Sequence, residues 1–246
     1  MNCIKSTLVV AAMAMLFIST GNAQEQEDSF LLDLTAFTIK YGHGSQFVDG
    51  VKKWKKCYQD NGGENKWNMW HRVQGNENVY VVSGRMDNWA EMDKEDPAGM
   101  ACGAIALQSI IPHIKSQDQN IARSMPKISR SSDLPNMSLI WSTGFKVKNH
   151  MAFMEVIEDV TSTIKGKEGD ERGYWYRVMG GTSMDYFVSS PYENFAALDK
   201  EEDSVWEVYK NVHGEKKTKE IREKFMTSYS DIWSYIYTLE EELSMP

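Results

Sequence analysis

Cysteine, proline and positive charge are all scarce in this chain. Its 246 residues include three cysteines and six prolines, and 35 acidic residues outnumber 27 basic ones, for a formal net charge of −8. An acidic chain without a basic cluster is a poor candidate for binding nucleic acid or an anionic lipid surface. The sequence also contains no Cys-x-x-Cys, no His-Glu-x-x-His and no glycine-rich phosphate loop, so it predicts neither a metal site nor a nucleotide site.

Long apolar runs are missing too, apart from one near the start. Lys5 precedes an uncharged apolar stretch at residues 8–18, and Gly21-Asn22-Ala23 follows it. This order is typical of a secretory signal peptide, so we expect cleavage after residues 1–23 and a secreted or periplasmic mature chain. The stretch is shorter than the roughly 20 residues of a membrane helix, and no later segment approaches that length, so we expect no stable membrane insertion.

Two cysteines remain after this cleavage. Cys57 ends a helical stripe and Cys102 follows a break at Pro97. An exported chain meets an oxidising compartment, which permits a disulfide between them, while two buried free thiols are the alternative.

The most informative feature is an internal repeat. Residues 82–95, Val-Ser-Gly-Arg-Met-Asp-Asn-Trp-Ala-Glu-Met-Asp-Lys-Glu, are matched by residues 188–201, Val-Ser-Ser-Pro-Tyr-Glu-Asn-Phe-Ala-Ala-Leu-Asp-Lys-Glu. Each copy is preceded by an apolar stripe with helical spacing, formed by Phe47, Val51, Trp54 and Tyr58 in one half and by Phe153, Ile157, Val160 and Ile164 in the other. The repeat predicts two related structural units in tandem.

Each unit is expected to run strand, helix, strand, strand, helical segment, strand. In the first we predict strands at 31–40, 66–74 and 79–85, a helix at 45–59, a helical stretch at 88–123 that breaks at Pro112, and a weak strand at 126–130. In the second we predict strands at 139–148, 172–179, 184–190 and 232–239, with helices at 150–164 and 193–226. Residues 24–130 and 137–246 would be the units, and the polar residues 131–136 their linker.

These residues resemble a known superfamily. A turn that enters a helix through a phenylalanine, and a third strand followed by Asp87-Asn88-Trp89-Ala90 or Glu193-Asn194-Phe195-Ala196, are similar to the dimeric α+β barrel proteins, which include the antibiotic biosynthesis monooxygenases. The resemblance covers almost the whole mature chain. It implies an α+β fold in which two ferredoxin-like βαββαβ units pair their sheets as a barrel within one chain, and a homo-oligomer could form beyond it.

The resemblance also implies positions to inspect for chemistry. Monooxygenases and haem-degrading members often have a Trp near the end of the third strand and a His in the next helix, but here Met86, Glu95, Tyr192 and Glu201 occupy those places. Chlorite dismutases, the tandem haem enzymes of the superfamily, use a histidine of the second unit, for which His213 is the nearest candidate. Because His213 lies among charged residues before Gly214, an exposed helix end is favoured, and we expect no cofactor, with haem disfavoured.

The best candidate for a ligand site is a Trp-x-Arg motif that occurs twice. Trp70 and Arg72 alternate on one strand, as do Trp175 and Arg177, so each pair shares a face and could hold an anionic or enolic ligand. The more ordinary interpretation is packing between sheets, with each Arg paired to an acid. His71 and its counterpart Tyr176 face the other way, and are weak candidates for proton transfer.

Two functions remain open. The first is an exported protein that binds a small apolar or aromatic molecule or has a structural role, and the missing Trp and His favour it. The alternative is a cofactor-independent monooxygenase or isomerase that acts on an aromatic or polyketide-like substrate. The fold alone does not choose between them, because one scaffold can carry several activities.

Overall fold

Eight antiparallel strands form a closed barrel in the computed structural model, which describes residues 29–246; the predicted signal peptide lies outside these residues. Around the barrel the strands follow the order β1-β3-β2-β8-β5-β7-β6-β4. The strands are β1 (Leu31–Ile39), β2 (Asn68–Arg72), β3 (Asn78–Met86), β4 (Ile114–Ser124), β5 (Leu139–Val147), β6 (Tyr174–Val178), β7 (Tyr186–Tyr192) and β8 (Tyr229–Leu239). Five α-helices pack outside: α1 (Gly44–Asp60), α2 (Pro97–Ala101), α3 (Gly103–Ser109), α4 (His150–Glu168) and α5 (Val205–Ser228).

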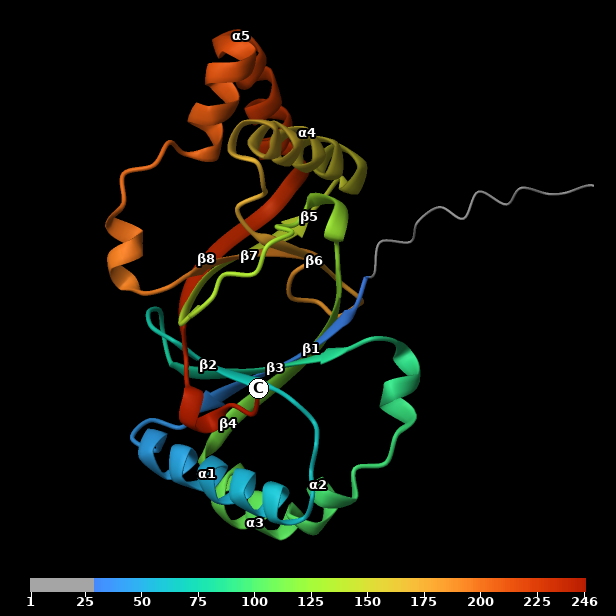
Figure 1. Cartoon of the computed structure of the whole chain (residues 1–246), viewed down its shortest axis with the longest axis vertical. Helices are drawn as coiled ribbons and strands as arrows, with labels where there is room; N and C mark the ends of the chain where they lie inside the picture. Colours follow the sequence, from blue (N-terminus) through green and yellow to red (C-terminus); the bar gives the residue numbers. More distant parts are fainter. Residues whose placement is uncertain (1–28) are drawn as a thin grey trace, which may run out of the picture.

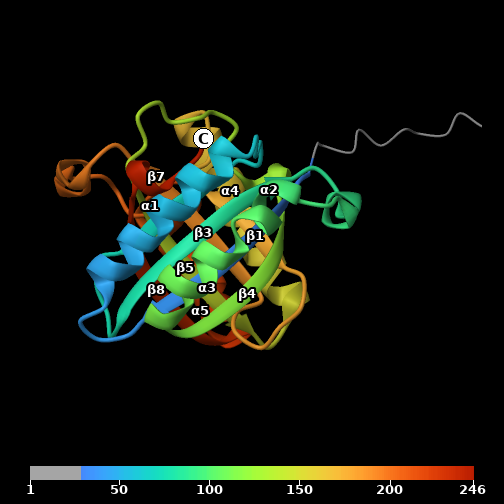
Figure 2. The same ribbon diagram turned by 90° about the horizontal axis from the view of Figure 1, so that it is seen from below.

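The barrel consists of two sheets with the same strand order. Strands β4, β1, β3 and β2 form one, strands β8, β5, β7 and β6 form the other, and the pairs β2–β8 and β4–β6 join them. Helices α1 to α3 cover the first sheet and α4 and α5 the second, so the barrel lies between two helical layers (Figure 1). Seen from below, α1 and α3 lie across the strands of the first sheet (Figure 2). The predicted α+β fold with a barrel closed within one chain is therefore confirmed.

Aromatic cores fix each main helix to its sheet. The ring of Phe47 in α1 lies 5.0 Å from that of Tyr80 in β3, and the ring of Phe153 in α4 lies 5.2 Å from that of Tyr186 in β7. Both phenylalanines are fully buried. The helical stripes in the sequence therefore mark the buried faces of α1 and α4, and burial of each phenylalanine contributes about 2–3 kcal/mol.

The repeated asparagines act as caps. Asn88 and Asn194 each precede a short 3-10 turn, and their side-chain oxygens accept hydrogen bonds from the backbone N–H groups of Ala90 and Ala197, at 3.0 and 3.1 Å. Such bonds satisfy donors that the first turn of a helix leaves free. The repeated motif is thus explained by local structure after β3 and β7.

One predicted segment is wrong. Residues 114–123, expected to be helical, belong to β4, and the strand expected at 126–130 is a 3-10 turn at Pro126–Ile128. Lys115 to Asn120 are all polar, because one face of this strand looks into the barrel cavity described below and no helix covers the other. The alternation that identifies a half-buried strand is therefore absent.

The two cysteines left open by the sequence form a disulfide. Cys57 of α1 is bonded to Cys102, which lies between α2 and α3, with Cα atoms 5.9 Å apart. The bond fastens the short helices to α1.

Within residues 29–246, no helix has the length and apolar character that crossing a membrane would require.

Candidate functional site

The barrel encloses a cavity of about 780 Å³. Every strand contributes to its wall, and residues of the segment 126–137 border one end. Its volume lies within the range of about 300–1,000 Å³ that is usual for small-molecule sites. An eight-stranded barrel is wide enough either to be filled by its own side chains or to hold one small ligand.

Small side chains explain why this barrel is hollow. Ala36, Ser83, Ser142 and Ser189 all face inward from the middle of their strands. Larger residues at these positions would fill the space, as in a packed barrel core. These small side chains therefore leave room for a ligand at positions where a packed barrel core would have larger residues.

Seven aromatic side chains form part of the wall, namely Phe30, Trp70, Tyr174, Tyr176, Phe187, Trp233 and Tyr237. Several are held in place by direct contacts. The indole N–H of Trp70 donates to the hydroxyl of Ser83 at 3.0 Å, and Tyr176 stacks on Phe187 with ring centres 4.7 Å apart. Fixed aromatic faces favour a flat aromatic ligand.

Burial raises the pKa of two phenols in the wall. It raises the pKa of Tyr176 far above its ordinary value, although Arg85 acts in the opposite direction. Burial likewise raises the pKa of Tyr237 to about 12, against the opposing charge of Arg72. Both hydroxyls are therefore neutral hydrogen-bond donors near pH 7.

The hydroxyl of Ser183 also borders the cavity. It is buried and has no hydrogen-bond partner among residues 29–246. Buried polar groups without a partner are costly, so this oxygen offers a polar contact to a bound molecule.

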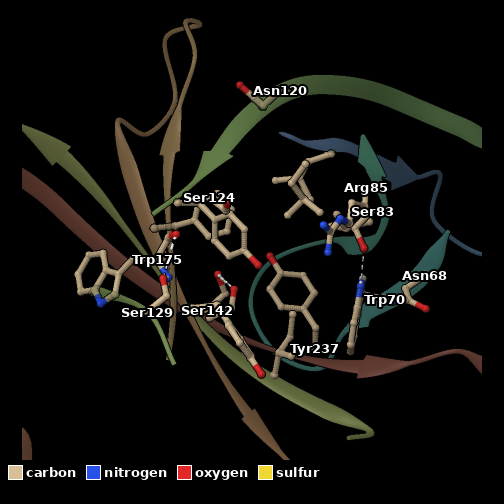
Figure 3. Close-up of a pocket in the computed structure, with 18 of the residues that line it drawn as sticks. Asn68, Trp70, Ser83, Arg85, Asn120, Ser124, Ser129, Ser142, Trp175 and Tyr237 are labelled. Atoms are coloured by element: carbon tan, nitrogen blue, oxygen red, sulfur yellow. Dashed lines mark hydrogen bonds between the residues drawn. The ribbon is translucent and has the colours of Figure 1, made fainter. Parts of the chain in front are cut away.

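The two predicted Trp-x-Arg pairs lie on opposite faces of the barrel wall. Trp70 lies in the cavity wall, whereas Trp175 borders the cavity but turns its indole outward, 5.7 Å from the ring of Phe145 (Figure 3). Strand register explains the difference. Trp70 is paired with Val81, and residue 187, which is 106 positions later, is paired with Tyr176. Tyr176 therefore holds the place of Trp70, and a shift of one residue puts Trp175 on the opposite face.

The other predicted residues lie away from the centre. The guanidinium of Arg72 stacks 4.5 Å above Tyr235 and donates to the carbonyl of Glu77 at 3.1 Å. Arg177 is exposed on the outer face of β6. His71 stacks on the ring of Tyr80 at 4.3 Å, on the side that faces helix α1. Trp70 and Tyr176 thus both border the cavity, whereas Arg72, Arg177 and His71 do not.

Sequence reasoning missed several residues of the wall. Trp233, Tyr235 and Tyr237 recur at every second position of β8, a spacing that places three aromatic side chains on one face of a strand. That pattern was a usable signal for Trp233 and Tyr237. Arg85 gave no comparable signal, because its counterpart at residue 191 is a proline.

No known protein family matches the sequence, and no curated protein does. Solved structures do match the fold. A putative monooxygenase from Lactobacillus acidophilus NCFM aligns over 87% of this chain and 94% of its own, with a TM-score of 0.52 at 10% identity. A mutant chlorite dismutase from Candidatus Nitrospira defluvii aligns over 87% and 94%, with a TM-score of 0.52 at 9% identity. Another mutant of it, in complex with cyanide, reaches 0.51 at 8% identity over 87% and 93%.

These matches contradict the expectation that the chain takes no cofactor. Chlorite dismutases, which the resemblance above identifies as tandem haem enzymes, have this fold over nearly the whole described chain. The expectation of no cofactor, with haem disfavoured, was therefore wrong, because haem proteins share this fold.

The residues around the cavity do not fit an axial haem ligand. Neither His nor Cys lines it, and residues 29–246 contain no group of three or more His, Cys, Asp or Glu side chains that could hold a metal ion. His213, the nearest candidate, belongs to α5, and its Nε2 lies 2.9 Å from the hydroxyl of Thr163 in α4. A phenolate could bind iron, but burial opposes ionisation of Tyr176 and Tyr237. At this level of identity the similarity establishes the barrel fold alone.

Proposed function

We propose that the protein is a monooxygenase-type enzyme that binds a small, flat, oxygen-bearing aromatic compound inside its barrel. One observation carries the proposal: the barrel interior is a cavity of about 780 Å³ with several aromatic side chains in its wall, instead of a packed core. The putative monooxygenase among the fold neighbours supports this alternative better than the binding or structural role that the sequence favours. At 10% identity a shared fold carries no activity over to this chain, so the residues of the cavity decide the chemistry.

The wall supplies binding and orientation. Trp70, Phe187 and Tyr237 offer ring faces to an aromatic ligand, and stacking on such faces fixes its plane. The neutral hydroxyls of Tyr176 and Tyr237 can donate hydrogen bonds to a carbonyl or phenol oxygen of the ligand. The unpartnered hydroxyl of Ser183 can do the same at another edge of the cavity.

These donors suit one class of reaction. A CH2 group beside a carbonyl, or linked to one through an aryl ring as in anthrone, becomes reactive toward dioxygen when it loses a proton to solvent and the carbonyl oxygen carries the resulting negative charge as an enolate. Buried donors held by the protein stabilise that charge more strongly than water does. With dioxygen as co-reactant, CH2 and O2 give C=O and H2O: two C–H bonds break, one oxygen enters the product and the other leaves as water. The chain's residues hold the ring and stabilise the oxyanion.

Oxygen uptake tests the proposal. Anthrone, a tricyclic ketone with one such CH2 group, is the probe, and we expect dioxygen consumption with a matching ketone product identified by mass. Ser142→Phe places a ring inside the cavity and should abolish turnover. Thr143→Phe, the neighbouring position on the outer face of β5, is the matched control and should leave turnover unchanged. Equal turnover in both variants would refute a site within the barrel.

We infer further that the two halves descend from one duplicated unit. The equal strand order of the two sheets, the asparagine caps after β3 and β7, and the paired aromatic cores under α1 and α4 all support this. The units would be residues 24–130 and 137–246, joined by 131–136. In that case Tyr176 occupies the place of Trp70, and the cavity has two related but chemically different walls.

A further inference from the structure

Arg85 stands out among the charged groups that line the cavity. Its guanidinium stacks 4.3 Å above the ring of Phe30 and donates no hydrogen bond to any residue from 29 to 246. The nearest carboxylate oxygen is that of Asp87, 3.5 Å from Nε, in a pair where both side chains are largely exposed, at 61% and 74%. An exposed pair of this kind at Nε contributes little, and the terminal amino groups of Arg85 donate no hydrogen bond to the described residues.

The other cations of the cavity are already engaged. Arg130 donates through Nε to the carbonyl of Ser132 at 2.9 Å, and Lys165 pairs with Glu171 at 3.2 Å. Arg85 is thus the one cavity-lining cation of the described residues that has no hydrogen bond to the protein, and its ion pair with Asp87 is exposed.

Acidic groups of the cavity lie elsewhere. Asp118 is paired with Ala36 of β1, and Arg85 is paired with Leu32 of the same strand. Ala36 and Leu32 are four positions apart. Four residues of strand span about 13 Å, so Asp118 borders the other end of the cavity. Asp133 belongs to the exposed segment between the two units. Arg85 therefore supplies a positive charge at its own end of the cavity, with Asp87 as its one ion-pair partner among the described residues.

The surroundings of Arg85 suit an aromatic ligand that carries an anion. Phe30 beneath the guanidinium also packs edge-on against Tyr176, with ring centres 6.2 Å apart. Figure 3 shows the guanidinium of Arg85 and the hydroxyl of Tyr237 directed into the same central space, with the indole of Trp70 beside them. A ring stacked in this space would place a substituent within reach of the arginine.

We infer that Arg85 binds a carboxylate on the ring of the ligand, so that the substrate class is an aromatic carboxylic acid. This inference rests on the proposed function, because it assumes that the ligand lies within the barrel. An arginine fixed by stacking presents two parallel N–H groups, which match the two oxygens of a carboxylate. A neutral group of the same shape would lack the charge-assisted part of this interaction.

Two naphthalenes test the inference by calorimetric titration at pH 7. Naphthalene-2-carboxylate and naphthalene-2-carboxamide have nearly the same shape and differ in charge. For the native chain we expect the carboxylate to bind about tenfold or more tightly than the carboxamide, since hydrogen bonds to charged groups are stronger by at least that factor. Arg85→Met keeps a stem on Phe30 and should make the two affinities equal by weakening the carboxylate alone.

Arg123→Met is the matched control. Arg123 lies at the same end of the barrel but on the outer face of β4, opposite Leu31, and its loss should leave the preference for the carboxylate intact. Arg85→Gln serves as a second variant if the methionine variant does not fold, and should likewise abolish the preference.

The outcomes separate this inference from the proposed function. If the native chain binds both naphthalenes equally, the carboxylate is wrong and the aromatic cavity stands. If the preference persists in a folded Arg85 variant, the anion binds elsewhere and the inference is wrong. If neither naphthalene binds, both the ligand site in the barrel and the inference fail.

Discussion

A hollow barrel should tolerate added bulk at one inward position of β5 and reject it two residues later. Ser142 faces the open cavity, whereas Gly144 faces the indole of Trp233, and a Cβ atom there would lie 3.0 Å from Cε2 of that ring. We therefore compare Ser142→Leu with Gly144→Leu. Both changes add the same side chain to the same strand.

The magnitudes follow from these surroundings. At Ser142, three added carbons contribute up to about 2 kcal/mol of apolar burial. Loss of the weak contact between Ser142 and Ser189, 3.4 Å long, costs about 1 kcal/mol, and ordering the leucine costs about as much again. The free energy of unfolding should therefore change by less than about 1 kcal/mol. At Gly144 the indole must move, and overpacking of this kind costs roughly 1–3 kcal/mol.

Urea unfolding followed by circular dichroism measures both values. We expect an unchanged midpoint for Ser142→Leu and a clearly lower one for Gly144→Leu, with similar slopes. Equal destabilisation by the two variants would mean that the barrel interior is packed at Ser142. The argument for a ligand cavity would then fail.

Three further predictions address other parts of the molecule. Replacing Cys57 and Cys102 with alanine releases a crosslink between positions 45 residues apart, and should lower the free energy of unfolding by up to about 4 kcal/mol in urea titrations; an unchanged value would show that the bond is not formed. Tyr237 keeps its proton up to about pH 12 in the folded chain and loses it near pH 10 when unfolded, so its contribution is full below about pH 10 and is lost between about pH 10 and 12. Tyr237→Phe should therefore flatten the fall of unfolding free energy over that interval, and an equally steep fall in the variant would refute the shift. Exported protein should begin at or near Gln24 by N-terminal sequencing, and an N-terminus at Met1 would contradict the signal peptide.

Much of the fold could be predicted because its signals are periodic. The stripes that begin at Phe47 and Phe153 mark α1 and α4 to within a few residues, and the repeated run at 82–95 and 188–201 locates β3, β7 and their caps. β4 escaped because it is polar on both faces. Its inward side chains face a cavity and its outward ones face solvent, so no hydrophobic pattern forms.

The site was harder to predict for a geometric reason. Aligning Trp70 with Trp175 matched two identical residue types, but strand pairing aligns Trp70 with Tyr176. A sequence match that is wrong by one residue changes the predicted face of every side chain in a strand. Arg85 could not be predicted as a site residue, because an arginine at the end of a strand indicates a site only when its neighbours in space are known.

A crystal soaked with 6-bromonaphthalene-2-carboxylate tests the central claim most directly, because anomalous scattering locates the bromine without assumptions about the ligand's pose. The account predicts a bromine peak inside the barrel, near Trp70 and Tyr237, with the carboxylate at Arg85. Absence of a peak within the barrel, or a peak only between the sheets and the outer helices, would contradict it.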